Sequence, residues 1–335
     1  MRTEFKLAVA LLLLAAPGIA GENAPSVPNT TLFKVTNLVS NEAGKAKNTD
    51  PNLINAWGLA QAKSSAPLWV ADNGTGVATV YAQGKGTNEG LVVNIPDGAP
   101  TGIVSVPSGS GFQISENGKN ANAAFLFDGQ TGVISGWNTS VDQSNAIAAY
   151  TSSGSDFTGL ALDPSSKLLF AADFAKNGVQ VLDNNFALKS TFTDSSLPAG
   201  FTPYNVAIFK GNVYVTFVSF GAGGGYVDVF SESGTLKQQL IVNGKLDIPW
   251  GMAIAPSTFG TFAGSLLVGN LGNGEINAYN LGSGKFLGTL STKKGTPIEI
   301  DGLWALDAAP KGDISFSAGP LGYADGLIGI ITANK

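Results

Sequence analysis

Histidine and cysteine are both absent from this chain of 335 residues. Without them the chain has no Ser-His-Asp or Cys-His catalytic group, no zinc site of the usual ligands, no histidine-bound haem and no disulfide. Charged residues are few, at 13%, and the net charge is −5. Nucleic acid is therefore not an expected partner, because binding phosphates requires a basic surface.

Long apolar runs are confined to the start of the chain. Residues 1–20 combine a basic MRTEFK, an apolar LAVALLLLAAPGIA, and small residues at Gly18 and Ala20, which together predict a cleaved signal peptide. An uncleaved anchor helix is the alternative, but the run is short and Pro17 interrupts it. We expect an exported protein, periplasmic or extracellular, without an integral membrane segment after cleavage. Residues 21–30 would be a flexible lead-in and residues 31–335 a single domain.

Glycine is abundant, with 44 residues, and six similar strand-like segments recur along the chain. They read WGLAQA from residue 57, TGIVSV from 101, TGLALD from 158, YNVAIF from 204, WGMAIA from 250 and WALDAA from 304, at intervals of 44, 57, 46, 46 and 54 residues. Each is followed by two further apolar segments joined by turns, and most by a third. This period, with four strands per unit, predicts an all-β fold, a six-bladed β-propeller with four antiparallel strands per blade.

The sixth unit ends after its third strand. The segment TLFKVTNLV at 31–39, which precedes the first unit, is the expected supplier of the missing fourth strand. The N-terminal strand would then close the last blade, so that the ring leaves no open sheet edge.

Aromatic residues stand at the start of several innermost strands, which line the channel of a propeller. Gly58 and Gly251 would let the backbones approach closely at the axis. The aromatic rings either fill the hub or line a ligand-binding mouth, and both interpretations stay open. The candidate ligand-binding residues are Asn55, Trp57, Tyr204, Asn205, Trp250, Asp301 and Trp304.

Polar residues end the second strands of four units, at Asp72, Asp128, Asp173 and Asn270. If the blades are equivalent, these groups gather on one face, where oxygen ligands suit calcium. The candidate metal ligands are Asp72, Asp173, Asn205 and Asn270. Asp and Asn also cap turns through hydrogen bonds to the backbone, which is the alternative role for each of them. Residues 107–123 and 221–225 are expected to be flexible edge loops.

The sequence resembles a family of uncharacterised exported bacterial propellers. The resemblance rests on stretches such as NTDPNLINAWGLA, LPAGFTPYNVAI and FGTFAGSLLVGNLGNGEINAYN, and it covers most of 37–330. It implies the fold and export, and no particular activity. More distantly, the chain is similar to NHL-repeat proteins and calcium-dependent gluconolactonase-like propellers. That similarity implies Asn205 and Asp173 as metal ligands, although the lactonase glutamate has no counterpart here.

Two specific functions remain in view, beside a purely structural role in an extracellular matrix. The first is a binding or interaction module that takes a small molecule, a glycan or a protein at the channel mouth. The second is a calcium-dependent hydrolase of lactones or esters, in which the ion polarises the carbonyl and Asp173 or Asp72 serves as general base.

Overall fold

The computed structural model describes residues 31–63, 65–96 and 98–334, which belong to one compact unit, Thr31–Lys335. The expected signal peptide at 1–20 and the lead-in at 21–30 lie outside the described residues. Helix in the described ranges is limited to α1 (Pro320–Tyr323) and the 3-10 turns η1 (Gly260–Phe262) and η2 (Pro310–Gly312). No helix there is long and apolar enough to cross a membrane.

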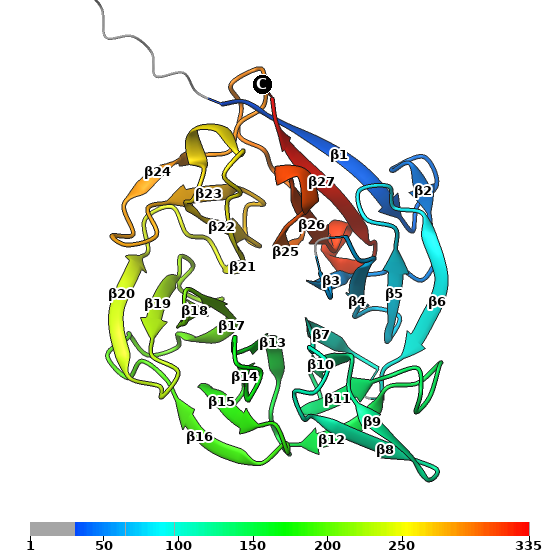
Figure 1. Cartoon of the computed structure of the whole chain (residues 1–335). Helices are drawn as coiled ribbons and strands as arrows, with labels where there is room; N and C mark the ends of the chain where they lie inside the picture. Colours follow the sequence, from blue (N-terminus) through cyan, green and yellow to red (C-terminus); the bar gives the residue numbers. More distant parts are fainter. Residues whose placement is uncertain (1–30, 64, 97, 335) are drawn as a thin grey trace, which may run out of the picture. The chain divides into compact units, whose positions relative to one another are not determined.

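Six antiparallel sheets stand around a central axis, which confirms the expected six-bladed propeller (Figure 1). Blade 1 contains β3 (Ala56–Ala60), β4 (Leu68–Asp72), β5 (Val77–Tyr81) and β6 (Asn88–Asn94). Blade 2 contains β7 (Pro100–Ser105), β10 (Phe125–Gly129), β11 (Val133–Trp137) and β12 (Ile147–Thr151). Blade 3 contains β13 (Phe157–Leu162), β14 (Leu168–Asp173), β15 (Gly178–Asp183) and β16 (Leu188–Phe192).

The remaining three blades complete the ring. Blade 4 contains β17 (Thr202–Phe209), β18 (Asn212–Val218), β19 (Tyr226–Phe230) and β20 (Leu236–Val242). Blade 5 contains β21 (Pro249–Ile254), β22 (Leu266–Asn270), β23 (Ile276–Tyr279) and β24 (Phe286–Thr289). Blade 6 contains β25 (Leu303–Ala308), β26 (Ile314–Ala318), β27 (Leu327–Ala333), β1 (Phe33–Ser40) and the short β2 (Asn48–Thr49).

Blade 6 is closed by the N-terminal strand, as the sequence predicted. β1 pairs antiparallel with β27 along its whole length, from Phe33 opposite Ala333 to Ser40 opposite Leu327. Figure 1 shows the two strands side by side at the edge of the ring. Phe33 is buried and its ring stacks on that of Phe262 in blade 5, with centroids 5.9 Å apart. The closing strand is therefore held by hydrogen bonds to one blade and by packing against the next.

Neighbouring blades pack face to face through large apolar side chains. Between blades 1 and 2, the ring of Trp69 stacks on Phe125 at 4.3 Å and lies 4.9 Å from Trp137. Both faces of each sheet are covered in this way, so most residues of the middle strands are buried. This is why β4 and β5, for example, read as continuous apolar runs and do not alternate with polar residues.

The segment 107–123 differs from the flexible loop expected of it. It contains a hairpin of β8 (Gln113–Glu116) and β9 (Lys119–Asn122), and Phe112 and Ile114 are buried in the core between blades 2 and 3. The turn is made by Asn117 and Gly118, both with positive φ. An Asn-Gly pair is a strong hairpin signal, and it stands in the sequence at this point. Residues 221–225, in contrast, form a connection outside the strands, as expected.

A buried carboxyl group lies between blades 3 and 4. Asp228 on β19 is fully buried, and the carboxylate of Asp194, which follows β16, lies near it. Burial first, and then the neighbouring Asp194 carboxylate, raise the pKa of Asp228 to about 8. The folded protein thus holds a proton at neutral pH that the unfolded chain, with an ordinary aspartate pKa, releases near pH 4.

Stability is therefore expected to fall as the pH rises from about 4 to about 8. Between these values the folded state binds more protons than the unfolded state, so this group lowers the free energy of unfolding by at most about 1.4 kcal/mol per pH unit. Asp228→Asn should make the slope measured by urea unfolding across this range less steep, while other buried carboxyl groups with raised pKa values, such as Asp72, keep a smaller slope. Glu89→Gln, an exposed change on β6, should leave the slope unchanged. An equally steep slope in Asp228→Asn would show that Asp228 does not contribute to it.

Candidate functional site

The six innermost strands, β3, β7, β13, β17, β21 and β25, surround the channel and approach one another closely. A Cβ atom on Gly58 would clash with the carbonyl oxygen of Thr101 in the next blade, and one on Gly251 with that of Trp304. The expected role of these two glycines is confirmed, since only glycine lets the backbones come this near.

Four aromatic rings meet across the channel on the face where the inner strands begin. We call Trp57, Tyr204, Trp250 and Trp304 the hub cluster; all four belong to one buried apolar group. The rings of Trp57 and Trp304 are stacked with centroids 3.6 Å apart, and Trp250 meets both edge-on at 6.3 and 6.0 Å. Each ring is at most 5% exposed. Their burial supports the interpretation that they fill the hub, and a direct ligand contact stays a prediction.

Polar atoms fix the hub rings in place. Trp304 Nε1 donates to Asn55 Oδ1 at 2.8 Å, and Trp250 Nε1 donates to the carbonyl oxygen of Thr158 at 2.8 Å. Asn205 Nδ2 donates to the carbonyl oxygen of Trp250 at 2.8 Å. Six of the seven candidate ligand-binding residues are thus brought together at the hub. The seventh, Asp301, is exposed outside it.

The four candidate metal ligands make separate hydrogen bonds. Asp72 accepts from Thr79 at 2.7 Å, and Asp173 from Ser155 and Gln180 at 2.6 and 2.7 Å. Asn270 accepts from the backbone of Asp247 at 3.0 Å, while Asn205 bonds at the hub as above.

Turn capping through the backbone, the alternative role expected from the sequence, is seen for Asp173 and Asn270, which accept from backbone amides. Asp72 bonds to the side chain of Thr79 instead, and its Oδ1 has no hydrogen-bond partner among the described residues. Asp72 and Asp173 are fully buried, and burial raises the pKa of Asp72 well above its usual range. Among the described residues, no group of three or more acidic side chains is placed to hold a metal ion. The calcium site therefore stays a prediction without support from the geometry.

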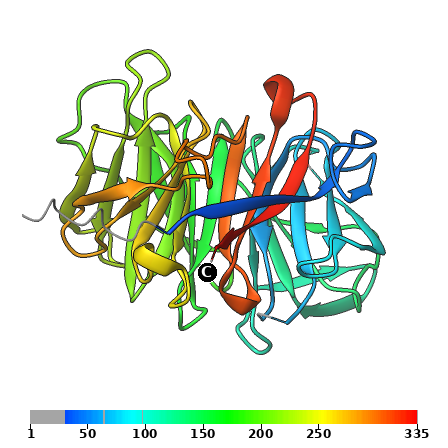
Figure 2. The same ribbon diagram turned by 90° about the horizontal axis from the view of Figure 1, so that it is seen from above.

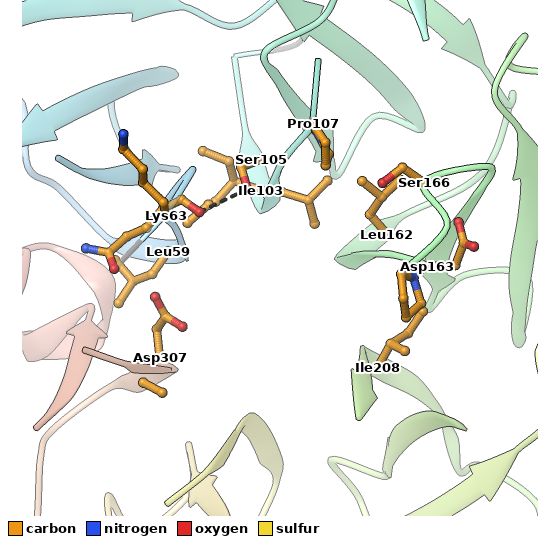
Figure 3. A pocket seen from close by; sticks show the side chains of 15 residues that line it. Leu59, Lys63, Ile103, Ser105, Pro107, Leu162, Asp163, Ser166, Ile208 and Asp307 are labelled. Carbon is orange, nitrogen blue, oxygen red and sulfur yellow. Dashed lines mark hydrogen bonds between the residues drawn. The ribbon is translucent and has the colours of Figure 1, made fainter. Parts of the chain in front are cut away.

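The channel opens into a cavity on the opposite face, where the inner strands end (Figure 3). This channel cavity has a volume of about 570 Å³, and a narrower space of about 230 Å³ lies deeper and reaches Trp250 of the hub. Both are lined by Leu59, Ile103, Leu162 and Ile208, so the two spaces are continuous. The lining combines aliphatic side chains with polar groups, and a concave space of this size is within the range of small-molecule sites.

One carboxyl group stands in the wall of the channel cavity. Asp307 on β25 is partly buried, and this burial raises its pKa to about 6, although a hydrogen bond from the backbone of Ala308 acts in the opposite direction. A perturbed carboxyl group in a cleft is a recognised mark of a functional site.

The other polar groups of the cavity either form hydrogen bonds within the protein or are exposed to solvent. Burial alone would raise the pKa of Asp163, but hydrogen bonds from Ser165, Leu168 and Lys167 lower it, so this carboxylate caps its own turn. Ser105 Oγ donates to the carbonyl oxygen of Gln61 at 2.9 Å. Lys63 lies at the rim and is exposed.

Sequence reasoning missed Asp307, although its signal is present in the repeats. When the inner strands are aligned, this position is filled by small apolar residues in the other five blades: Ala60, Val104, Ala161, Ala207 and Ala253. A charged residue that breaks an internal apolar repeat is a candidate for function.

Comparisons with known proteins give relatives without a stated activity. No family model matches the chain. It is 31% identical over 333 residues to the uncharacterized protein R648 of Acanthamoeba polyphaga mimivirus, covering 91% of this chain and 81% of the relative. Uncharacterized protein L690 of the same virus is 29% identical over 331 residues, covering 90% and 86%. The bacterial origin expected of the family stays a prediction, as does the link to gluconolactonase-like propellers.

Two solved structures share the fold at low identity. A glucose dehydrogenase matches with a TM-score of 0.61 and 14% identity over 90% of this chain and all of that one. The hydrazine synthase of Kuenenia stuttgartiensis matches with a TM-score of 0.54 and 12% identity over 83% and 80%. At these identities the likeness shows the fold alone.

Gly251→Ala should destabilise the protein by about 1–3 kcal/mol, because the new methyl group must displace backbone of the next inner strand. Gly221→Ala is the matched control, since a Cβ there meets nothing within 4 Å and its φ is not left-handed. Urea unfolding measures both. Equal effects of the two changes would contradict the close packing of the channel.

Proposed function

We propose that this protein is a binding module that takes small molecules into the channel cavity. The premise is that the chain belongs to the family of the mimivirus protein R648. The observation that carries the proposal is Asp307, a carboxyl group with a pKa of about 6 in the wall of this cavity. The aliphatic residues of the same lining carry no charge, and the exposed Lys63 at the rim makes no ion pair with Asp307 among the described residues. Figure 3 places it beside open space.

The chemistry of the cavity favours a ligand with an apolar body and a protonated amine. Asp307 is ionised at neutral pH, and burial makes that charge costly until a cation pairs with it. Asp163 is already satisfied by its turn, so the cavity offers one carboxylate to one ammonium group. The aliphatic side chains below would bury the rest of the ligand.

Binding accounts for these features better than hydrolysis. The hydrolase alternative needs a calcium ion and a base beside it, yet Asp72 and Asp173 are fully buried in different blades. The glucose dehydrogenase and the hydrazine synthase transfer no activity to this chain, because one fold supports unrelated chemistry. Export, expected from residues 1–20, is part of the proposal.

The test is thermal unfolding with n-hexylamine, n-hexanol and hexanoate, three probes with the same apolar chain. Hexylamine should raise the unfolding midpoint in a saturable manner, because a ligand that binds only the folded state stabilises it by mass action. Hexanol should give a smaller rise and hexanoate none. Below the pKa of Asp307, the hexylamine affinity should fall by about tenfold per pH unit.

Asp307→Asn should remove the preference for hexylamine over hexanol. Asp301→Asn is the matched control, because Asp301 precedes the same strand, β25, at its opposite end. The proposal fails if none of the probes shifts the midpoint, or if hexylamine stabilises the wild type and Asp307→Asn equally.

A further inference from the structure

A second candidate site lies on the opposite face, where the hub cluster meets the surface. The connection after β18 carries Phe220, and the connection after β26 carries α1 with Leu321 and Tyr323. Both join the second strand of a blade to the third, and Figure 2 shows α1 projecting from the ring. Phe220 is 56% exposed, Leu321 71% and Tyr323 44%.

The exposed rings continue the hub cluster outward. Phe220 meets Tyr204 at a right angle with centroids 5.6 Å apart, and Phe174 contacts both of these rings at 5.8 and 5.7 Å. On the other side Tyr323 lies over Trp304 at 5.5 Å. Tyr204 and Trp304 themselves are 6.2 Å apart, so the two exposed rings are connected by ring contacts through the buried hub.

The backbone that presents Tyr323 is strained. Leu321, Gly322 and Tyr323 have φ values of 53°, 62° and 73°, a left-handed conformation that leucine and tyrosine rarely adopt. A hydrogen bond from the Leu321 amide to Asp301 Oδ2, at 2.9 Å, helps to hold it. An exposed leucine in this conformation does not stabilise the folded state, because its side chain buries little apolar surface. Such strain is characteristic of segments held for binding.

A chain of polar groups runs around the rings. Asn55, which holds Trp304, donates to Asn73 Oδ1 at 3.0 Å, and Asn73 donates to Gln130 Oε1 at 3.1 Å. Gln130 is in turn hydrogen-bonded to Asp156.

This row of polar groups ends at the Asp156 carboxyl group, one oxygen of which accepts no hydrogen bond within the described part of the chain. Oδ1 of Asp156 is buried and without a hydrogen-bond partner among the described residues. The Phe174 amide donates to the carbonyl oxygen of Asp156 at 2.8 Å, and the Phe174 ring contacts those of Tyr204 and Phe220, which places Asp156 beside the ring cluster. Burial first, and then the charges of Tyr323 and Asp156, raise the pKa of the Tyr204 hydroxyl. Hydroxyl, amide and carboxylate groups therefore stand next to exposed ring faces.

We infer that this face binds a neutral carbohydrate, with Phe220 and Tyr323 packing on the sugar rings and Asp156 accepting from sugar hydroxyls. A sugar has apolar ring faces and hydroxyls that both donate and accept, which matches the exposed aromatic rings and the row of polar groups. A purely apolar partner would leave Asp156 buried and unpaired, which is unfavourable. This site is independent of the channel cavity and of Asp307.

The test is native gel electrophoresis through gels containing soluble starch, hydroxyethylcellulose, glycol chitin, galactomannan or dextran. At least one polysaccharide should retard the wild type. Phe220→Ala and Tyr323→Ala should each weaken the retardation by about tenfold, and Asp156→Asn should weaken it as well. The two ring variants change exposed side chains, so folding is expected to survive, and circular dichroism checks this.

Phe286→Ala is the matched control, since Phe286 is also exposed but lies on the outer strand β24. It should leave the retardation unchanged, and so should Asp307→Asn, which separates this inference from the proposed function. The inference is overturned if no polysaccharide retards the wild type. It is also overturned if the double variant Phe220→Ala/Tyr323→Ala is retarded as strongly as the wild type.

Discussion

Antiparallel pairing of β1 with β27 is the constraint on which the rest of the structure depends. The ring of six sheets is closed because the N-terminal strand, which leads into blade 1, pairs within the last sheet, blade 6. Closure then holds the inner strands so near the axis that Gly58 and Gly251 have no room for a side chain. The same proximity brings aromatic rings from four blades together at one end of the channel.

The fold could be predicted from the sequence because its signals are local and repeated six times. Strand order, the closing strand and the two crowded glycines all follow from the spacing of similar segments. The hairpin at 113–122 was missed because it interrupts the repeat, although its Asn117-Gly118 turn was visible.

The site was harder to predict, because equivalent positions in a repeat need not share a role. Asp72 and Asp173 end equivalent strands, yet Asp72 accepts from Thr79 and Asp173 from Ser155, and the described residues bring no group of three acidic side chains together. Asp307 is informative for the opposite reason, since it departs from the repeat. The row of hydrogen-bonded polar groups that ends at Asp156 joins four blades. The spacing of residues within one segment of the sequence cannot reveal hydrogen bonds between blades.

The closing blade also orders the events of folding. Its strands come from both ends of the domain, residues 33–40 and 303–333, so its pairing spans nearly 300 residues of intervening chain. Contacts of such long sequence separation form late, because the entropy of loop closure must first be overcome. Blades 1 to 5 can each form as synthesis proceeds, whereas the ring is sealed only after the last strand has been made. Until then β1 is an unpaired edge, which makes the nearly complete chain the species most exposed to misassociation.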